Sequence, residues 1–138
     1  MRPGFDYIGI TVQFLCHDGA GHLLFSKRSQ HCRDERGTWE LGGGQLEYGE
    51  DPETGVMREL AEEYGVKGVP IQAFLGHANI LRTHEGEKTH WVCLSYVFRI
   101  PRAAPTIQSP RSIDALAWHT LFALPAPLHT GTRMILEK

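Results

Sequence analysis

Long apolar runs, paired cysteines and an excess of one charge are all missing from this sequence of 138 residues. No stretch approaches the roughly 20 apolar residues that span a bilayer, so we expect no membrane partner. Residues 1–6 lack an apolar signal core, and the three cysteines (Cys16, Cys32 and Cys93) fit neither a disulfide framework nor a zinc site. Both absences favour the cytoplasm. The net charge of −2 excludes nucleic-acid binding by bulk charge.

What remains is an ordinary globular composition. Apolar residues make up 41% and charged residues 22% of the chain, which argues against disorder. The length suits one domain with one core. We therefore expect a single domain over residues 1–138.

Hydrophobic patterning predicts a mixed α/β chain. Strict alternation over residues 8–15 predicts a half-buried strand, and turn residues before Leu23 predict a hairpin with a second strand. Glycines 42–44 interrupt a strand-like stretch. Further along, the pattern predicts strands over 70–81, 91–100 (central in the sheet) and 115–118, a charged loop over 84–88, and a closing helix over 129–137.

A helix is predicted between Asp51, a suitable N-cap that precedes Pro52, and Gly65, a natural stop. At 100° per residue, one apolar stripe contains Val56, Met57, Leu60, Ala61 and Tyr64. Beside it, three carboxylates share about 100° of helix surface. These carboxylates belong to Glu59, Glu62 and Glu63.

The acidic face has two interpretations. It is either a solvated surface or a site for a divalent cation, and helical charge runs are commonly the former. Like charges three and four positions apart repel by roughly 0.2–0.5 kcal/mol per pair, and Arg58 is the only cation on the helix. Hard carboxylate oxygens select Mg²⁺, Mn²⁺ or Ca²⁺ rather than zinc.

The segment around this helix resembles the Nudix box. The match consists of Gly44, five residues, Glu50, seven residues, Arg58-Glu59-Leu60, one residue, Glu62-Glu63, one residue and Gly65-Val66. Nine specified positions recur by chance in such a chain with odds on the order of 10⁻⁸. The chain is therefore identified as a member of the Nudix hydrolase family.

That resemblance implies a three-layer α/β/α sandwich with a mixed β-sheet. It also implies hydrolysis of a nucleoside diphosphate linked to another group, X, with Mg²⁺ as cofactor and Mn²⁺ as a substitute. Carried over by position, the catalytic set is Arg58, Glu59, Glu62 and Glu63, and its three acids bind metal. Gly43 matches a residue whose carbonyl joins them, whereas Gly44 and Glu50 support the box.

Two departures from the family pattern stand out. Gly42 replaces the proline that usually precedes the box glycines, which loosens the loop without removing a ligand. Where many relatives carry a Glu-Pro-Glu stretch, this chain has Ser109-Pro110-Arg111, and Asp114 is the nearest acid. Ser109 and Arg111 therefore stand where those relatives have acids.

Several further residues keep two interpretations. Arg28 either contacts substrate phosphate or is solvated, and Trp39 either stacks on a base or belongs to the core. His84, His90, His119 and His129 show no metal spacing. For the base that activates water, the candidates are Glu59 itself, Asp114, and the loop acids Glu85 and Glu87.

The resemblance implies the family but does not identify the substrate. The leading expectation is a pyrophosphohydrolase of nucleoside triphosphates, including oxidised or non-standard ones, followed by nucleotide sugars or ADP-ribose. The alternatives are a catalytically silent module that binds a nucleotide as a regulator, and a plain acidic-helix interaction protein. A nucleotide is the expected small-molecule partner, and a homodimer is not excluded.

Overall fold

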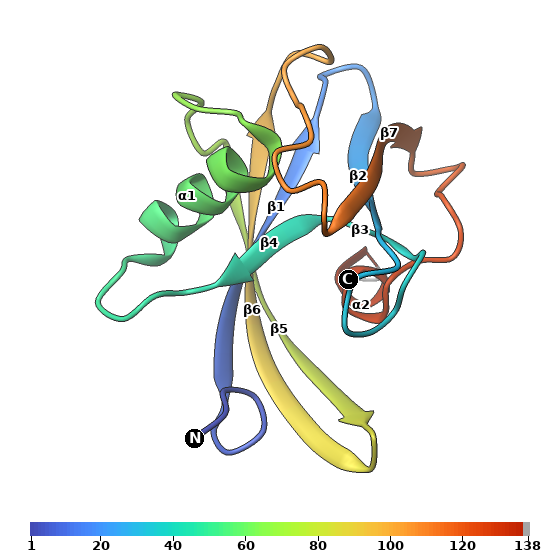
Figure 1. The fold of residues 1–138 in the computed structure, drawn as a ribbon. Coiled ribbons are helices and arrows are strands. Elements are labelled where there is room, and N and C mark those ends of the chain that lie inside the picture. Colours follow the sequence, from blue (N-terminus) through green and yellow to red (C-terminus); the bar gives the residue numbers. More distant parts are fainter. Residues whose placement is uncertain (137–138) are drawn as a thin grey trace.

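The structure is a computed structural model that describes residues 1–136, without the side chain of His84. Its elements follow the order β1 (Gly9–His17), β2 (His22–Arg28), β3 (Trp39–Glu40), β4 (Gly42–Gln45), α1 (Pro52–Tyr64), β5 (Ala73–His84), β6 (Glu87–Arg99), β7 (Ile113–Thr120) and α2 (Thr130–Leu136). Figure 1 shows the strands between the two helices.

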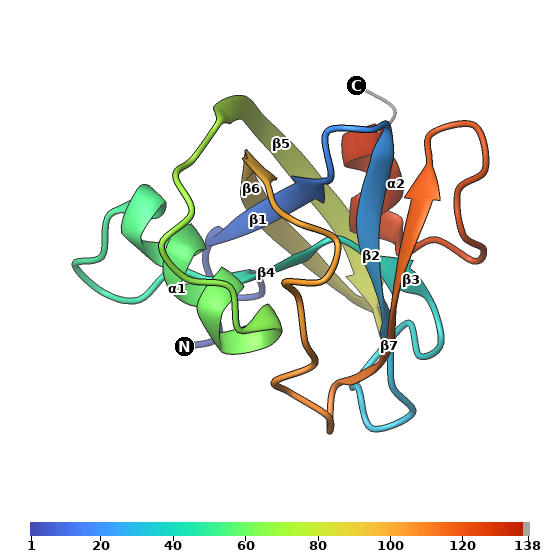
Figure 2. The ribbon, with the colours of Figure 1, turned by 90° about the horizontal axis from the view of Figure 1, so that it is seen from above.

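All seven strands form one mixed sheet. Its main order is β3-β2-β1-β6-β5, with β4 added to β1 and β7 added to β2. β1 pairs with β6 in parallel, and the other named pairs are antiparallel. Viewed from above, α1 and α2 lie on opposite sides of the sheet (Figure 2). The predicted three-layer α/β/α arrangement is confirmed.

The main core lies between β1, β6 and α1. Alternate residues of β1 point inward, because side chains of a strand alternate between its faces. Phe14 of β1 meets Tyr64 of α1 edge-to-face, with ring centroids 5.0 Å apart. Val56 and Leu60 complete the buried face of the helix. This packing fixes the side of α1 that presents the carboxylates.

Helix α1 has the predicted ends, with two corrections. Asp51 has extended N-cap backbone, but its side chain makes no capping hydrogen bond. Met57 is 42% exposed rather than part of the buried stripe, because it lies at the border of the apolar sector. Gly65 ends the helix in the left-handed conformation, with φ 68°.

Two strand predictions need correction. β1 pairs with β2 only at His17 and Leu23, so the expected hairpin closes at its turn and then opens. β5 and β6 reach residues 84 and 87, leaving a two-residue connection where a charged loop over 84–88 was expected. β6 lies between β1 and β5, which confirms the central strand.

The C-terminal elements agree with expectation within a few residues. β7 extends the predicted strand 115–118 at both ends. Of the predicted closing helix 129–137, α2 covers residues 130–136; His129 precedes it, and residue 137 lies outside the described residues. The three cysteines are free thiols, as expected. Both helices of residues 1–136 are too short and too polar to traverse a bilayer.

Candidate active site

The site begins at β4, where side chains are absent because neighbouring groups fill their space. A Cβ on Gly42 would lie 2.2 Å from the Phe14 ring, and one on Gly43 would lie 2.2 Å from the carbonyl oxygen of Val12. A Cβ on Gly44 would lie 2.3 Å from Oε1 of Glu59. The close approach of β4 to both β1 and α1 therefore requires these glycines.

Arg58 ties the loop before α1 to the helix. Its Nε and Nη2 donate to the two carboxylate oxygens of Glu50, at 2.7 and 3.0 Å. Its Nη1 donates to Glu59 at 2.9 Å and to Glu62 at 3.1 Å. The hydrogen bonds from Arg58 to Glu50 lower the pKa of Glu50, because an arginine stabilises the charged form of a carboxyl group. The contact that the sequence predicts between Glu50 and Arg58 is therefore formed.

Glu63 is the buried acid of the site. Its Oε2 accepts the backbone N–H of Gly43 at 3.0 Å, which points the Gly43 peptide toward α1. Burial raises the pKa of Glu63 well above its usual range, and the charges of Glu59 and Glu40 add to that rise. Burial also raises the pKa of Glu59, against the opposing effect of Arg58. Both carboxylates are therefore costly to ionise without a further cation.

The three box acids lie on one side of α1 but do not converge on a single point. Within residues 1–136, no three His, Cys, Asp or Glu side chains form a ready metal-binding group. Arg58 is the cation that Glu59 and Glu62 contact. The donor set nevertheless fits a hard divalent cation, since it offers carboxylate oxygens with elevated pKa beside a glycine backbone. Rotation of Glu59 and Glu62 away from Arg58 would complete it.

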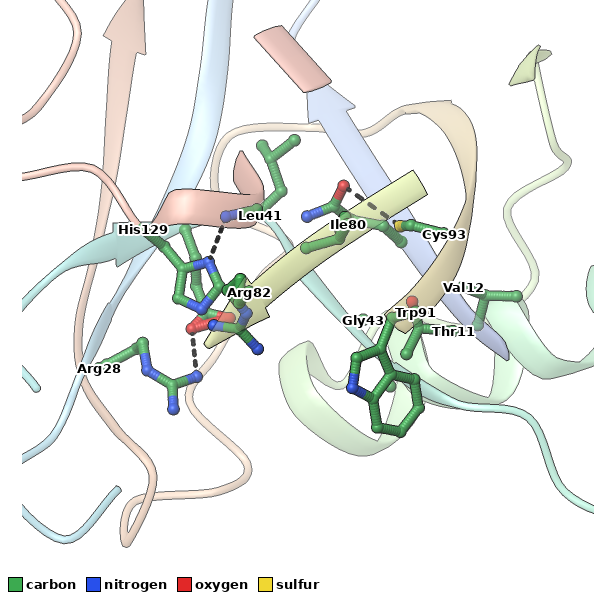
Figure 3. A pocket seen from close by; sticks show the side chains of 14 residues that line it. Thr11, Val12, Arg28, Leu41, Gly43, Ile80, Arg82, Trp91, Cys93 and His129 are labelled. Atoms are coloured by element: carbon green, nitrogen blue, oxygen red, sulfur yellow. Dashed lines mark hydrogen bonds and ion pairs between the residues drawn. The ribbon is translucent and has the colours of Figure 1, made fainter. Parts of the chain in front are cut away.

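A cleft of about 200 Å³, here called the main cleft, runs from β4 to the hairpin of β5 and β6. Its walls include Gly43 and Gly44 of β4 together with Arg28, Arg82 and His129. Figure 3 shows these three cationic or imidazole groups together, apart from Trp91 and Cys93. A second hollow of about 400 Å³ contains Glu63 and Gly43, and shares Arg28 and Glu40 with the main cleft. The two hollows therefore meet at β3, β4 and the end of β2.

Charged side chains from distant segments form one network beside the main cleft. Arg28 pairs with Glu40 at 2.7 Å and with Asp34 at 2.8 Å. Arg82 pairs with Glu35 at 2.7 Å, and its Nη1 lies 3.7 Å from Asp34. His129 completes the network through Nε2, which lies 2.9 Å from Glu35. Here the charge network means Arg28, Asp34, Glu35, Glu40, Arg82 and His129.

Sequence reasoning did not identify most of this network. Arg82 lies too far along the chain from Glu35 and Glu40 for any local pattern to join them. Only Arg28 and His129 were considered, the latter without a role. The one available signal for Glu40 is its position two residues before Gly42, the first glycine of β4.

The remaining candidates lie elsewhere. Glu85 has φ 50° in the β5–β6 turn, and Glu87 pairs with Arg2 at 2.5 Å. Figure 1 draws the tip of this hairpin, in yellow, well away from α1. Asp114 is exposed near the start of β7, next to Ile113, which lines the second hollow. Trp39 packs edge-on against His119, with centroids 6.0 Å apart, in a small apolar cluster.

Comparison with known proteins decides the family. The family model described as "NUDIX domain" matches residues 8–138, nearly the whole chain. The chain belongs to the NUDIX family. The catalytic and metal-binding roles of its box residues remain predictions that the geometry is compatible with.

Individual relatives and structures agree with this membership. A MutT-like protein from Streptomyces ambofaciens is 60% identical over 47 residues, which are 34% of this chain and only 27% of that relative. An RNA pyrophosphohydrolase from Acidiphilium cryptum is 26% identical over 130 residues, covering 86% of this chain and 79% of the relative. The crystal structure of a MutT NUDIX hydrolase from Burkholderia pseudomallei superposes with a TM-score of 0.81 at 28% identity, covering 96% of this chain and 98% of that one.

Proposed function

We propose that this NUDIX protein hydrolyses a phosphoric anhydride bond of a nucleoside diphosphate derivative, with nucleoside triphosphates as the first substrates to test. The observation that carries the proposal is the juxtaposition of Glu63 and Glu59 with the Gly43–Gly44 backbone, which lines two adjoining hollows. Relatives whose names denote a pyrophosphohydrolase or a MutT hydrolase support it. The box acids are all present, which disfavours the catalytically silent alternative.

In this proposal, Glu59, Glu62, Glu63 and the Gly43 carbonyl would hold Mg²⁺ or Mn²⁺. When bound, the cation would offset the charge of the diphosphate oxygens and acidify the attacking water. Arg58 keeps Glu50 and the loop before α1 in place. Arg28, at the junction of the two hollows, is positioned to contact a phosphate if it exchanges one of its carboxylate partners. Trp39 as a stacking residue stays a prediction.

For the base that accepts the proton of water, we propose Glu59. It lies with the other box acids, whereas Glu85 and Glu87 lie at a hairpin tip that is drawn away from α1 (Figure 1). A base must come within hydrogen-bond reach of the water or act through one bridging water. The double variant Glu85→Gln/Glu87→Gln and the variant Asp114→Asn are each expected to lose less than tenfold in rate. A loss above about 100-fold in either, with metal affinity intact, would move the base away from Glu59.

The function itself is tested with a panel of nucleoside triphosphates, nucleotide sugars and ADP-ribose, scored by release of phosphate or diphosphate. Turnover should require Mg²⁺ or Mn²⁺ and stop with EDTA. Glu62→Gln should reduce it at least about 100-fold, because the change removes charge from the metal-assisted transition state. Glu53→Gln, on the same helix but outside the box positions, is the matched control and should keep activity. Full turnover of Glu62→Gln at saturating Mg²⁺ would refute the metal assignment.

The oligomeric state and the cellular compartment also stay predictions. A homodimer is checked by light scattering on the purified protein. The match to the Streptomyces relative covers only 27% of that relative's length, so the activity of the whole protein is also a proposal.

A further inference from the structure

Arg82 leaves most of its hydrogen-bonding capacity unused. In residues 1–136, its Nη1 alone bonds an acceptor, Oε2 of Glu35. Its Nε is buried and has no hydrogen-bond partner there. Buried donors are nearly always paired, and an orphaned one calls for an explanation. Among the described residues, nothing therefore accepts a hydrogen bond from the Nε–Nη2 edge of this guanidinium.

This arginine lies in the wall of the main cleft. Ile80, two positions earlier on β5, lines the same cleft, as do Trp91 and Cys93 from the neighbouring strand. The Trp91 indole lies against Gly4 and Gly9, where an added Cβ would approach within 2.4 Å of the ring. Figure 3 shows Arg82 and Trp91 on different sides of the cleft. The cleft thus combines a fixed aromatic ring with a planar donor group.

The charges around Arg82 disfavour a phosphate as the missing acceptor. The charge network holds two guanidinium groups against the three carboxylates of Asp34, Glu35 and Glu40. The Nδ1 of His129 accepts the N–H of Gly131, so this nitrogen carries no proton, and burial lowers the pKa of the ring. An anion at Arg82 would therefore meet a surplus of negative charge. A neutral acceptor suits the position better.

We propose that Arg82 is a specificity-determining residue that binds a nucleobase edge carrying two adjacent acceptors. This inference rests on the proposed function. With the diphosphate beside the Gly43–Gly44 backbone, we place the base of the same nucleotide beside Arg82, which lines the same cleft. Arginine binds the O6 and N7 acceptors of guanine through such a fork. Hypoxanthine shares that edge, and cytosine offers O2 beside N3.

The same geometry predicts which bases are poor. Adenine places a donor, N6, beside its N7 acceptor. Uracil separates its two carbonyl oxygens by the N3–H donor. Each would leave one of the two Arg82 donors without an acceptor, and a site built to hydrogen-bond a group rejects an analogue that lacks it. The protein should therefore select 6-oxopurine or cytosine nucleotides over adenine and uracil nucleotides.

The test measures kcat/KM for GTP, ITP, CTP, ATP and UTP with Mg²⁺. The wild-type protein should prefer GTP and ITP, or CTP, by about ten- to a hundredfold over ATP and UTP, mainly through KM. Preference for GTP with ITP assigns the purine edge, and preference for CTP assigns the cytosine edge. A preference for ATP or UTP, or equal rates for all five, would overturn the proposal.

Arg82→Lys separates recognition from support of the fold. Lysine keeps the positive charge beside Glu35 but loses the fork. The preferred triphosphate should lose at least about tenfold in kcat/KM, while ATP changes less than about threefold. Arg36→Lys, an exposed arginine outside the cleft, is the control and should change neither. A uniform loss over all bases would show that Arg82 only supports the structure.

Binding of monophosphates distinguishes failure of this proposal from failure of the proposed function. GMP, IMP, CMP, AMP and UMP are titrated calorimetrically into the metal-free wild-type protein and into Arg82→Lys. Selective binding of GMP and IMP, or of CMP, that disappears in Arg82→Lys supports the base site even if no triphosphate is hydrolysed. Binding without base preference refutes it, as does an absence of binding, whatever the hydrolytic activity.

Discussion

At the scale of single residues, Glu63 is a carboxyl group whose surroundings disfavour its charged form. Its buried carboxyl has a pKa raised by desolvation and by the charges of Glu59 and Glu40. Because the folded-state pKa lies above the unfolded one, folding favours the protonated form. The free energy of unfolding of the metal-free protein should therefore be higher at acidic pH and fall as the pH rises through the folded-state pKa.

Glu63→Gln should remove this dependence, because glutamine can still accept the Gly43 N–H but carries no charge. We expect the melting temperature in EDTA to change less between pH 5 and pH 8 than in the wild-type protein, and to be higher at pH 8. Turnover should drop at least about 100-fold. Glu62→Gln is the control for the pH profile, since the Glu62 side chain is 57% exposed. An unchanged profile in Glu63→Gln would contradict the assignment.

Arg58 contacts three carboxylates of the site, so its replacement should reduce both stability and activity. Arg58→Ala removes both bonds to Glu50 and the bonds to Glu59 and Glu62. We expect a lower melting temperature and a loss of activity of about 10²-fold, because small displacements of catalytic groups are expensive. Arg58→Lys should be intermediate, since it restores charge without the bidentate geometry. A melting temperature equal to that of the wild-type protein in Arg58→Ala would exclude a bracing role.

At the scale of elements, α1 contains a glycine where helix propensity favours alanine by about 1 kcal/mol. A Cβ on Gly55 would lie 2.4 Å from Cδ2 of Leu46 and 2.9 Å from Oε1 of Glu50. Overpacking of this kind costs about 1–3 kcal/mol, so the gain in propensity is outweighed. Gly55→Ala should therefore lower the midpoint of urea unfolding. Thr54→Ala, at an exposed position of the same helix, should leave it equal or higher.

The same helix shows which structural features can be predicted from nearby residues in the sequence. Its ends, its buried stripe and its acidic face follow from residues within 23 positions. The sequence therefore predicts them, except that Met57 is exposed and that Asp51 makes no capping hydrogen bond. The β5–β6 hairpin was predicted too short, because Arg82, Glu87 and Lys88 are typical of a loop. In the folded sheet, however, Arg82 pairs with Glu35 and Glu87 pairs with Arg2, while the backbone of both strands keeps its ladder.

The residues of the site fall into two groups, those that are close in sequence and those that only the folded sheet brings together. The box acids and Arg58 are close in sequence, and a motif can find them. The charge network joins the loop after β2, the strand β5 and the start of α2, so it exists only after the sheet has formed. No spacing rule links Glu35 to Arg82 or to His129. Residues brought together by tertiary pairing are therefore the ones that the sequence did not reveal.

At the scale of the whole molecule, Glu35 joins three parts of the chain. Its Oε1 accepts the backbone N–H of Thr130 at 2.8 Å and the Thr130 hydroxyl at 2.6 Å, while Oε2 pairs with Arg82 and His129. Burial alone would raise the pKa of Glu35, but the bonds from Thr130 and the nearby cations lower it. Its contribution to stability is therefore present at neutral pH and is lost as the pH falls through the folded-state pKa.

Glu35→Ala should cost about 1–3 kcal/mol of unfolding free energy at pH 7, as expected for leaving charged or polar partners unpaired. The loss should shrink in acid, and hydrogen exchange should accelerate at the start of α2. Asp114→Ala, an exposed acid on β7, is the control and should change stability little. Equal exchange rates at the Thr130 amide in both variants would contradict the assignment.

The parallel pairing of β1 with β6 has a consequence for how the chain folds as it is made. Gly9 pairs with Trp91 and His17 with Arg99, so the earliest strand has to wait for one of the later ones. At about 5–20 residues per second, ribosomal synthesis of the intervening segment takes on the order of several seconds. During that interval Val12 and Phe14 have no parallel neighbour to cover them. The nascent chain is then most exposed to aggregation, and a pause before residue 99 would prolong that exposure.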